Sequence, residues 1–437
     1  MKYYSLNNPE SKDAANTSFR EAVINGLAPD RGLYFPEKIT PLDKDFIEHL
    51  ELYENDEIAF RVIQQFVGGE IPDDELRKIV SETLSFDFPL NKVEEDVYAL
   101  ELYHGPTMAF KDVGARFMAR CLGYFNKDKD QETVRVLVAT SGDTGGAVAS
   151  GFLGVEGVEV IILYPSGKVS DIQEKQLTTL GQNITALEVD GVFDDCQDMV
   201  KTAFLDPELN ACNLTSANSI NVARWLPQMF YFFIAARELK KQGKEPVFAV
   251  PSGNFGNICA GIMAYRLGLP IKHFVAATNI NRTVPDFMNS GKYEPRPSKA
   301  TISNAMDVGN PSNFIRIQTL FENDFDLLKA MFTSESYTDE ETRTAMKAIY
   351  DRSEYIADPH GAVGYLGLKD YQKNVPGTTG VFLETAHPVK FLDTVEETLN
   401  TKITIPEQIV SIIDKQKKSV LISNYDQLKT FLLKDSH

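Results

Sequence analysis

Four times in this chain, a short run of β-branched and apolar residues stops in a Gly-, Ser- or Asn-rich loop and a helical pattern follows. "TVRVLVAT" leads into "SGDTGGAVASGF", "VFAVP" into "SGNFGNICAGIMAYRLG", "VEVIILYP" into "SGKVSDIQEKQL", and "TTGVFLET" into "AHPVKFLDTVEETL". Strands that alternate with helices form parallel sheets whose faces are covered by those helices. The sequence therefore predicts an α/β fold, with ligands bound in the loops beyond the carboxyl ends of the strands.

The length of the chain predicts more than one domain, because 437 residues exceed the size at which a single core usually keeps growing. Residues 1–90 are rich in acidic side chains and contain the helical patterns "DEIAFRVIQQFV" and "DDELRKIVSETL". We expect a mainly helical N-terminal region over residues 1–90, a smaller α/β domain over 91–215 and a larger α/β domain over 216–437.

Charge, hydropathy and cysteine usage exclude several partner classes. A net charge of −18 lacks the basic footprint that nucleic acids or anionic membranes require. The apolar runs are too short to cross a bilayer, and the N-terminal "MKYYSLNNPESKDAAN" lacks the regions of a signal peptide. The four cysteines form no C-x-x-C pair, and no His/Cys cluster has ligand spacing. We expect a cytoplasmic protein with reduced thiols, no bound metal, and no nucleic-acid or membrane partner.

Three common loop motifs are absent, and two loops that suit anions remain. G-x-G-x-x-G, the P-loop and G-x-S-x-G do not occur. "SGNFGN" contains Gly253 and Gly256, which permit close backbone approach, and precedes a helix N-terminus that favours phosphate. "TSGDTGG" (residues 140–146) has the same arrangement and suits a substrate carboxylate. Taken alone, each loop is more typical of a plain connecting turn.

Lys111 follows the small and apolar residues of "HGPTMAFKD". A lysine is normally a surface residue whose stem covers apolar neighbours. A lysine behind an apolar run, together with two anion loops, fits a cofactor that carries an aldehyde and a phosphate. Pyridoxal 5'-phosphate is such a cofactor, and it is usually held as a Schiff base with lysine.

"HGPTMAFKDVGARF" closely resembles the pyridoxal-phosphate lysine segment of the threonine synthases, in the fold-type II (tryptophan synthase β-like) group. "TSFREAVINGLAPDRGLYFPEKI", "TSGDTGGAVA", "SANSINVARWLPQ", "PSGNFGNICAG", "ADPHGAVGY" and "ETAHPVKF" resemble further blocks of the family, in the family's order. The resemblance extends over nearly the whole chain. It implies two parallel-sheet α/β domains, the first with the cofactor lysine and carboxylate loop and the second with the cofactor's phosphate loop.

The resemblance also implies roles for individual residues. Lys111 would hold the cofactor and move protons during catalysis. Cofactor contacts would come from Gly253, Asn254, Phe255, Gly256 and Asn257 at the phosphate, from Thr385 at the pyridine nitrogen and from Asp143 near the phenolic oxygen. Substrate contacts would come from Thr107, Ser141, Gly142, Thr144, Ser216, Asn218, Asn221 and Arg224. Many relatives outside the threonine synthases carry Asn in place of Asp143, so we expect Asp143 to be protonated or turned away from the phenolate.

The reaction implied by the resemblance converts O-phospho-L-homoserine and water to L-threonine and phosphate, in a monomer or homodimer. The residues leave two alternatives open: another fold-type II lyase, such as a threonine dehydratase or a cysteine synthase-like enzyme, and a non-catalytic paralogue that binds pyridoxal phosphate. "GLAPDRGLYFPE" and the long N-terminal region favour a threonine synthase over the other lyases. A nicotinamide enzyme is disfavoured because the dinucleotide fingerprint is absent.

Overall fold

All four predicted strand–loop–helix units are present in the computed structural model of the chain, which describes residues 1–127 and 133–434. Their strands are β5 (Val134–Ala139), β6 (Val158–Pro165), β9 (Pro246–Pro251) and β12 (Thr379–Glu384). Every residue of β5, β9 and β12 is buried, as near-continuous apolar strands in parallel sheets require. The α/β prediction is therefore confirmed.

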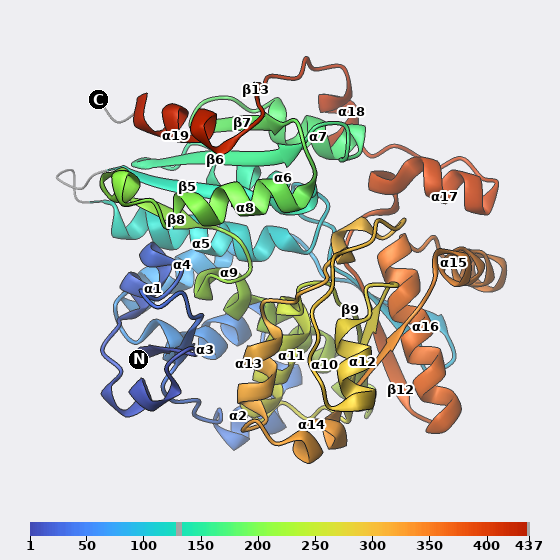
Figure 1. Cartoon of the computed structure of the whole chain (residues 1–437). Helices are drawn as coiled ribbons and strands as arrows, with labels where there is room; N and C mark the ends of the chain where they lie inside the picture. The colour runs from blue at the N-terminus through green and yellow to red at the C-terminus, as the bar shows by residue number, and fades with distance from the viewer. Residues whose placement is uncertain (128–132, 435–437) are drawn as a thin grey trace.

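The strands belong to two separate sheets, one in each lobe of the molecule (Figure 1). The larger sheet has the order β11-β10-β9-β12-β4-β3, and only β3 runs antiparallel to its neighbour. The smaller sheet has the order β13-β7-β6-β5-β8 and is entirely parallel. The other strands of the two sheets are β3 (Leu90–Glu94), β4 (Val97–Glu101), β7 (Ile184–Val189), β8 (Leu214–Ser216), β10 (His273–Thr278), β11 (Phe332–Ser336) and β13 (Val420–Ile422).

Helices cover both faces of each sheet. In β9, Phe248 and Val250 face the core beneath α10 and α11, whereas Val247 and Ala249 face the core beneath α15 and α16. The smaller sheet lies between α5 and α6 on one face and α8 and α19 on the other. The bounds of these helices are α5 (Lys111–Phe125), α6 (Asp143–Phe152), α8 (Phe193–Ala203), α10 (Met229–Lys240), α11 (Gly256–Arg266), α15 (Asp339–Ser353), α16 (Pro359–Asn374) and α19 (Tyr425–Lys434).

The N-terminal region is mainly helical, as predicted, and shares its core with both lobes. Its α-helices are α1 (Phe19–Asn25), α2 (Lys44–Glu48), α3 (Asn55–Val67) and α4 (Asp73–Thr83), and two short 3-10 helices accompany them. Before α2, β1 (Tyr3–Ser5) and β2 (Tyr34–Pro36) form a short antiparallel pair. Tyr3 and Phe66 are buried in the same apolar cluster as Phe117 of α5 and Phe230 of α10. The region is thus an integral part of the fold.

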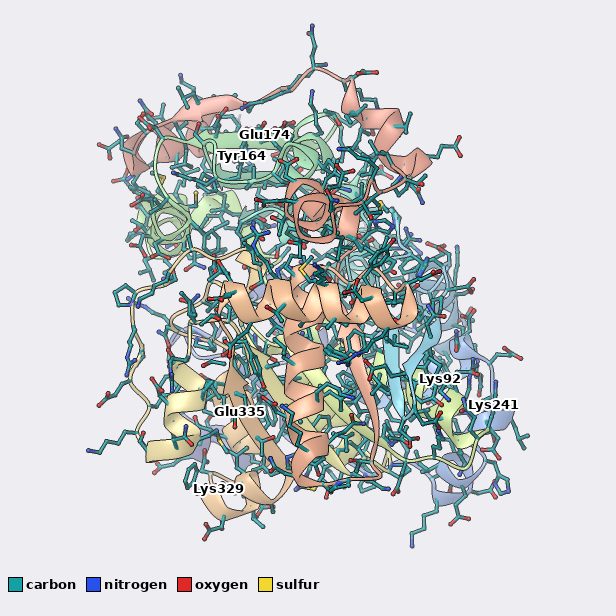
Figure 2. The ribbon with its side chains drawn as sticks, turned by 90° about the vertical axis from the view of Figure 1, so that its right-hand side faces the viewer. Lys92, Tyr164, Glu174, Lys241, Lys329 and Glu335 are labelled. Atoms are coloured by element: carbon teal, nitrogen blue, oxygen red, sulfur yellow. The ribbon has the colours of Figure 1, made fainter. Side chains whose placement is uncertain are left out.

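The two sheets do not follow the expected ranges 91–215 and 216–437 at two places. β4, which is buried on both faces, pairs with β12 in the larger sheet. β13, near the end of the chain, pairs with β7 at the edge of the smaller sheet. Lys417, shortly before β13, donates from Nζ to Oε1 of Glu174 at 2.7 Å, and the same Nζ lies 5.8 Å from the ring centre of Tyr164. Glu174 and Tyr164 are labelled in Figure 2.

Shorter helices complete the fold: α7 (Asp171–Thr178), α9 (Val222–Trp225), α12 (Thr283–Ser290), α13 (Phe314–Leu320), α14 (Phe325–Met331), α17 (Leu392–Leu399) and α18 (Glu407–Ile413). All four cysteines are buried, as the sequence predicted, and none of them forms a disulfide. Among the described residues, no helix combines the length and the apolar character that crossing a membrane would require.

Candidate active site

Lys111 is the first residue of α5, and backbone pairing places it beside the end of β12. The segment before α5 runs along the residues that follow β12, with the Phe110 N–H donating to the Thr385 carbonyl at 2.8 Å. The His387 N–H in turn donates to the Met108 carbonyl at 3.0 Å. Two segments far apart in the sequence are therefore fixed side by side, which brings Lys111 close to Thr385.

A cavity of about 420 Å³ lies beyond the carboxyl ends of β5, β9 and β12, and it takes residues from both lobes. Most of the residues singled out from the sequence line it: Lys111, Ser141, Asp143, Thr144, Asn218, Arg224, Gly253, Asn254, Phe255, Gly256, Asn257 and Thr385. This position is where parallel sheets bind ligands. The strand-end loops thus converge on one cavity, as the sequence pattern indicated.

The Lys111 amine lies in apolar and charged surroundings, and its side chain is 17% exposed. Its Nζ lies 4.9 Å from the centre of the Phe110 ring and 3.8 Å from Oδ2 of Asp143. Burial lowers the pKa of Lys111; Lys390 and Arg224 act in the same direction, while Asp143 opposes them. The amine therefore loses its proton more readily than an exposed lysine does.

Asp143 lines the cavity, and its carboxyl lies between Lys390 and Lys111. Burial alone would raise the pKa of its carboxyl, but Lys390 and then Lys111 outweigh burial and hold that pKa below its ordinary value. Oδ1 lies 2.7 Å from Nζ of Lys390 and accepts a hydrogen bond from Nε2 of Gln173 at 2.9 Å. Asp143 therefore lies between two lysines whose charges favour the ionised form of its carboxyl.

The loop before α11 has the features of a phosphate site. Phe255 has φ +61°, in the left-handed region, and ends the loop immediately before the first helical residue, Gly256. The Asn254 side chain donates to Oγ of Ser219 at 2.9 Å and its oxygen accepts from the N–H of Ser312, so it holds the loop in shape. The first N–H groups of a helix have no intrahelical partner and favour an anion.

The residues of the cavity fit pyridoxal phosphate. A Cβ on Gly253 would lie 2.7 Å from the Cα of Met306, so only glycine leaves the loop its present path. The Lys111 amine suits the aldehyde of the cofactor, the α11 N-terminus suits its phosphate, and the hydroxyl of Thr385 lines the same cavity. The chain thus supplies a donor for each end of the cofactor.

Four residues that the resemblance assigned to the substrate do not line the cavity: Thr107, Gly142, Ser216 and Asn221. Asn221 is fully buried, with Nδ2 donating to the Val23 carbonyl at 2.8 Å and Oδ1 accepting from the N–H of Ala223 at the start of α9. Thr107 donates from its N–H and its hydroxyl to Asp112. In this structure both side chains maintain the backbone around the site rather than face it.

Arg224 is buried yet reaches the cavity wall. One of its terminal nitrogens donates to the Ala217 carbonyl, while its Nε is buried without a hydrogen-bond partner among the described residues. Burial lowers the pKa of Arg224 to about 10. A buried donor without a partner is costly, so this guanidinium suits an anion that enters the cavity.

Sequence reasoning missed several residues of the site. His360, which was not selected, lines the cavity: its Nε2 accepts from the Ala305 N–H at 3.2 Å, and its Nδ1 lies 2.6 Å from Oδ1 of Asp358. Lys390, the buried partner of Asp143, lies in "ETAHPVKF", and its only signal was a lysine among apolar residues. His104, by contrast, lies outside the cavity wall and contacts Glu101 at 2.7 Å.

Comparison with known proteins identifies the family. Residues 38–385 match the pyridoxal-phosphate dependent enzyme family, and residues 361–432 match the C-terminal domain of threonine synthase. Threonine synthase from Haemophilus influenzae is 44% identical, over 99% of this chain and 100% of that protein. The crystal structure of threonine synthase from Escherichia coli covers 100% of both chains at 40% identity, with a TM-score of 0.93.

The structure of pyridoxal-phosphate-bound threonine synthase from Brucella melitensis also covers 100% of both chains, at 33% identity and a TM-score of 0.91. These similarities span the N-terminal region and both lobes, and the cavity described above contains a lysine and a helix N-terminus that fit the cofactor. This chain therefore belongs to the family of pyridoxal-phosphate-dependent threonine synthases, with the fold-type II architecture.

Proposed function

We propose that the chain converts O-phospho-L-homoserine and water to L-threonine and phosphate, with Lys111 as the catalytic residue. The position of Lys111 carries the proposal: its amine faces a cavity at which the ends of β5, β9 and β12 meet. Pyridoxal phosphate, when bound, withdraws electrons from the substrate carbon that carries the amino group and so acidifies its hydrogen. The side chains of the protein bind and orient the substrate and transfer its protons.

Lys111 moves the protons of the reaction. Its amine takes the proton from Cα of the substrate and, once it has passed that proton on, takes one from Cβ as phosphate leaves Cγ. Protons are then returned to Cγ and to Cα, and water adds its hydroxyl at Cβ. A base that works near neutral pH needs a lowered pKa, which burial gives Lys111. The neutral hydroxyl of Thr385 is the proposed contact of the cofactor's pyridine nitrogen, and unlike a carboxylate it leaves that nitrogen only weakly basic.

Two anion sites hold the substrate by its ends. Ser141 and Thr144, at the start of α6, are the proposed contacts of its carboxylate. Arg224 and Asn218 are the proposed contacts of its phosphate, and the position of both residues in the cavity wall supports that assignment. Fixing both ends at once sets the orientation of Cα, Cβ and Cγ toward the Lys111 amine. The acidic surface of the protein makes such local donors necessary.

The test is to incubate the purified holoenzyme with O-phospho-L-homoserine and to measure threonine and phosphate together. Equal release of both supports the proposal. Phosphate released with a keto acid would instead identify a lyase that eliminates phosphate without adding water at Cβ. Release of neither product would show that the substrate belongs to another class.

Lys111→Ala tests the residue assignment. We expect this variant to lose turnover and the covalently held cofactor, because it lacks the amine that lies beside Asp143 in the cavity. Lys92→Ala is the control, since Lys92 is an exposed lysine paired with Glu95 on the outer strand β3. Lys92, which is labelled in Figure 2, does not line the cavity. Substantial threonine formation by Lys111→Ala would refute the assignment.

We also place the protein in the cytoplasm, as a monomer or homodimer. Four buried cysteines that form no disulfide support a reducing compartment. Size-exclusion chromatography with light scattering distinguishes the two states, and a larger particle would contradict the proposal.

A further inference from the structure

Lys390 is a fully buried lysine beside the proposed site. Its side chain is 0% exposed, and it lies in the short 3-10 helix η6 (Pro388–Phe391) that follows β12. Its Nζ lies 2.7 Å from Oδ1 of Asp143 and donates to the Thr107 carbonyl at 2.9 Å. Lysine is almost never fully buried unless it is paired, so this residue needs an explanation.

Asp143 lies between two ammonium groups at unequal distances. Its Oδ1 is 2.7 Å from Lys390, within hydrogen-bonding distance, whereas its Oδ2 is 3.8 Å from Nζ of Lys111, beyond it. Gln173 also donates a hydrogen bond to Oδ1, at 2.9 Å. Oδ1, the oxygen nearer Lys390, therefore has two donors. The Asp143 carboxylate therefore pairs directly with Lys390, whereas its interaction with Lys111 is a longer-range attraction between charges.

We propose that Lys390 is a positioning residue of the site: by pairing with Asp143, it keeps that carboxylate from binding the Lys111 amine. The inference rests on the proposed role of Lys111 and deepens it. Without Lys390, the buried carboxylate would have Lys111 as its nearest cation and would hold the amine in its charged form. A protonated amine has no lone pair with which to take up an aldehyde or a proton.

The charges that face Lys111 come from four elements. Asp143 at the start of α6 and Asp358 at the N-terminus of α16 favour its charged form, whereas Lys390 of η6 and Arg224 of α9 oppose it. Burial, the largest influence, lowers the pKa of Lys111 as well. Removing Lys390 therefore removes one opposing charge and frees one favouring carboxylate, and both changes raise the pKa of Lys111.

Thr107 connects Lys390 to the segment that ends at Lys111. Its carbonyl accepts from Lys390 and, at 3.0 Å, from Nε2 of Gln176, while its N–H donates to Asp112 at 2.9 Å. Asp112 is the residue directly after Lys111. Lys390 thus contacts both the carboxylate opposite Lys111 and the turn that carries Lys111.

The test is competitive labelling of the cofactor-free protein with trace acetic anhydride across a pH series, with Lys111 acetylation measured by mass spectrometry. We expect Lys390→Met to raise the midpoint of Lys111 labelling by about one pH unit, so that labelling below the midpoint is about tenfold slower. Lys390→Arg keeps the charge and is expected to keep the wild-type midpoint. The measurement needs neither cofactor nor substrate. It therefore tests the role of Lys390 even if the protein does not catalyse the proposed reaction.

The double variant Asp143→Asn, Lys390→Met separates electrostatics from structure. If Lys390 acts through Asp143, the neutral pair restores a midpoint close to that of the wild type, and it does so without a buried unpaired charge. A merely structural role would lower the melting temperature of Lys390→Met and leave the midpoint of Lys111 in place. An unchanged midpoint, or equal shifts in the single and double variants, would overturn the proposal.

Should Lys390→Met fail to fold, Asp143→Asn alone provides the second measurement. This variant keeps the positive charge of Lys390, which lowers the pKa of Lys111, and removes the negative charge of Asp143, which raises it. We therefore expect the midpoint of Lys111 labelling to fall below that of the wild type. A rise in this midpoint would contradict the inference as clearly as an unchanged midpoint in Lys390→Met.

Discussion

A methyl group added at Gly253 measures how tightly the proposed phosphate loop is packed. The Cβ of Gly253→Ala would lie 2.7 Å from the Cα of Met306 and 2.8 Å from the carbonyl oxygen of Ala305. Both atoms belong to backbone, and the Ala305 N–H is held by His360, so the segment has to shift by several tenths of an ångström. Overpacking of this kind costs about 1–3 kcal/mol. Such a loss of free energy corresponds to about fivefold to 150-fold weaker binding of the cofactor.

The assay is titration of the cofactor-free variant with pyridoxal phosphate, followed by the absorbance of the bound cofactor. Gly256→Ala is the matched control, because its Cβ would meet the side chains of Asn313 and Ser219 at 3.3 Å rather than backbone. We expect the affinity of Gly256→Ala for the cofactor to fall by less than about threefold, because side chains can move aside at lower cost than backbone and because alanine is a better helix former than glycine. Equal affinities for Gly253→Ala and the wild type would refute the reasoning that this loop binds the cofactor.

Two further predictions address the substrate and acid stability. Arg224→Lys keeps the charge but loses the guanidinium, so we expect the KM for O-phospho-L-homoserine to rise about tenfold while kcat changes less; an unchanged KM would mean that another group holds the phosphate. Burial lowers the pKa of His273 and of His387 from 6.5 to about 4, so the unfolded chain binds more protons between these values. The stability that these neutral rings give is complete above about pH 6.5 and is lost as the pH falls toward 4, which urea unfolding at several pH values measures. In His273→Asn, the free energy of unfolding should depend less steeply on pH between 6.5 and 4 than in the wild type. An equally steep dependence would contradict this assignment to His273.

The fold was predictable where local pattern and burial coincide. β9 is apolar throughout, β5 is apolar except for Arg135, and each ends in a glycine-containing loop, so strand, loop and helix could be located from the sequence. The resemblance and the apolar residues before Lys111 pointed to the same lysine. These signals are short-range, and a sequence displays short-range signals directly.

The unpredicted parts of the site depend on contacts between distant residues. Lys390 and Asp143 are 247 positions apart in the chain and meet only because β12 and β5 end at the same cavity. Asn221 looked like a substrate ligand because it is polar and lies in a family block, yet its amide contacts the carbonyl of Val23 in α1. No local pattern distinguishes a polar side chain that faces a ligand from one that caps a helix.

The position of β13 and α19 has a consequence for how the protein is made. Arg135, at the start of β5, donates to the carbonyl of Leu432 at 2.7 Å, so a strand from the first third of the chain is completed by residues near its end. During synthesis, which proceeds from the N-terminus, the lobe that carries Asp143 waits for almost the entire polypeptide before its last edge strand and helix can dock. A ribosome that stops a few dozen codons early would release a chain with every proposed catalytic and binding side chain present but with one lobe unfinished.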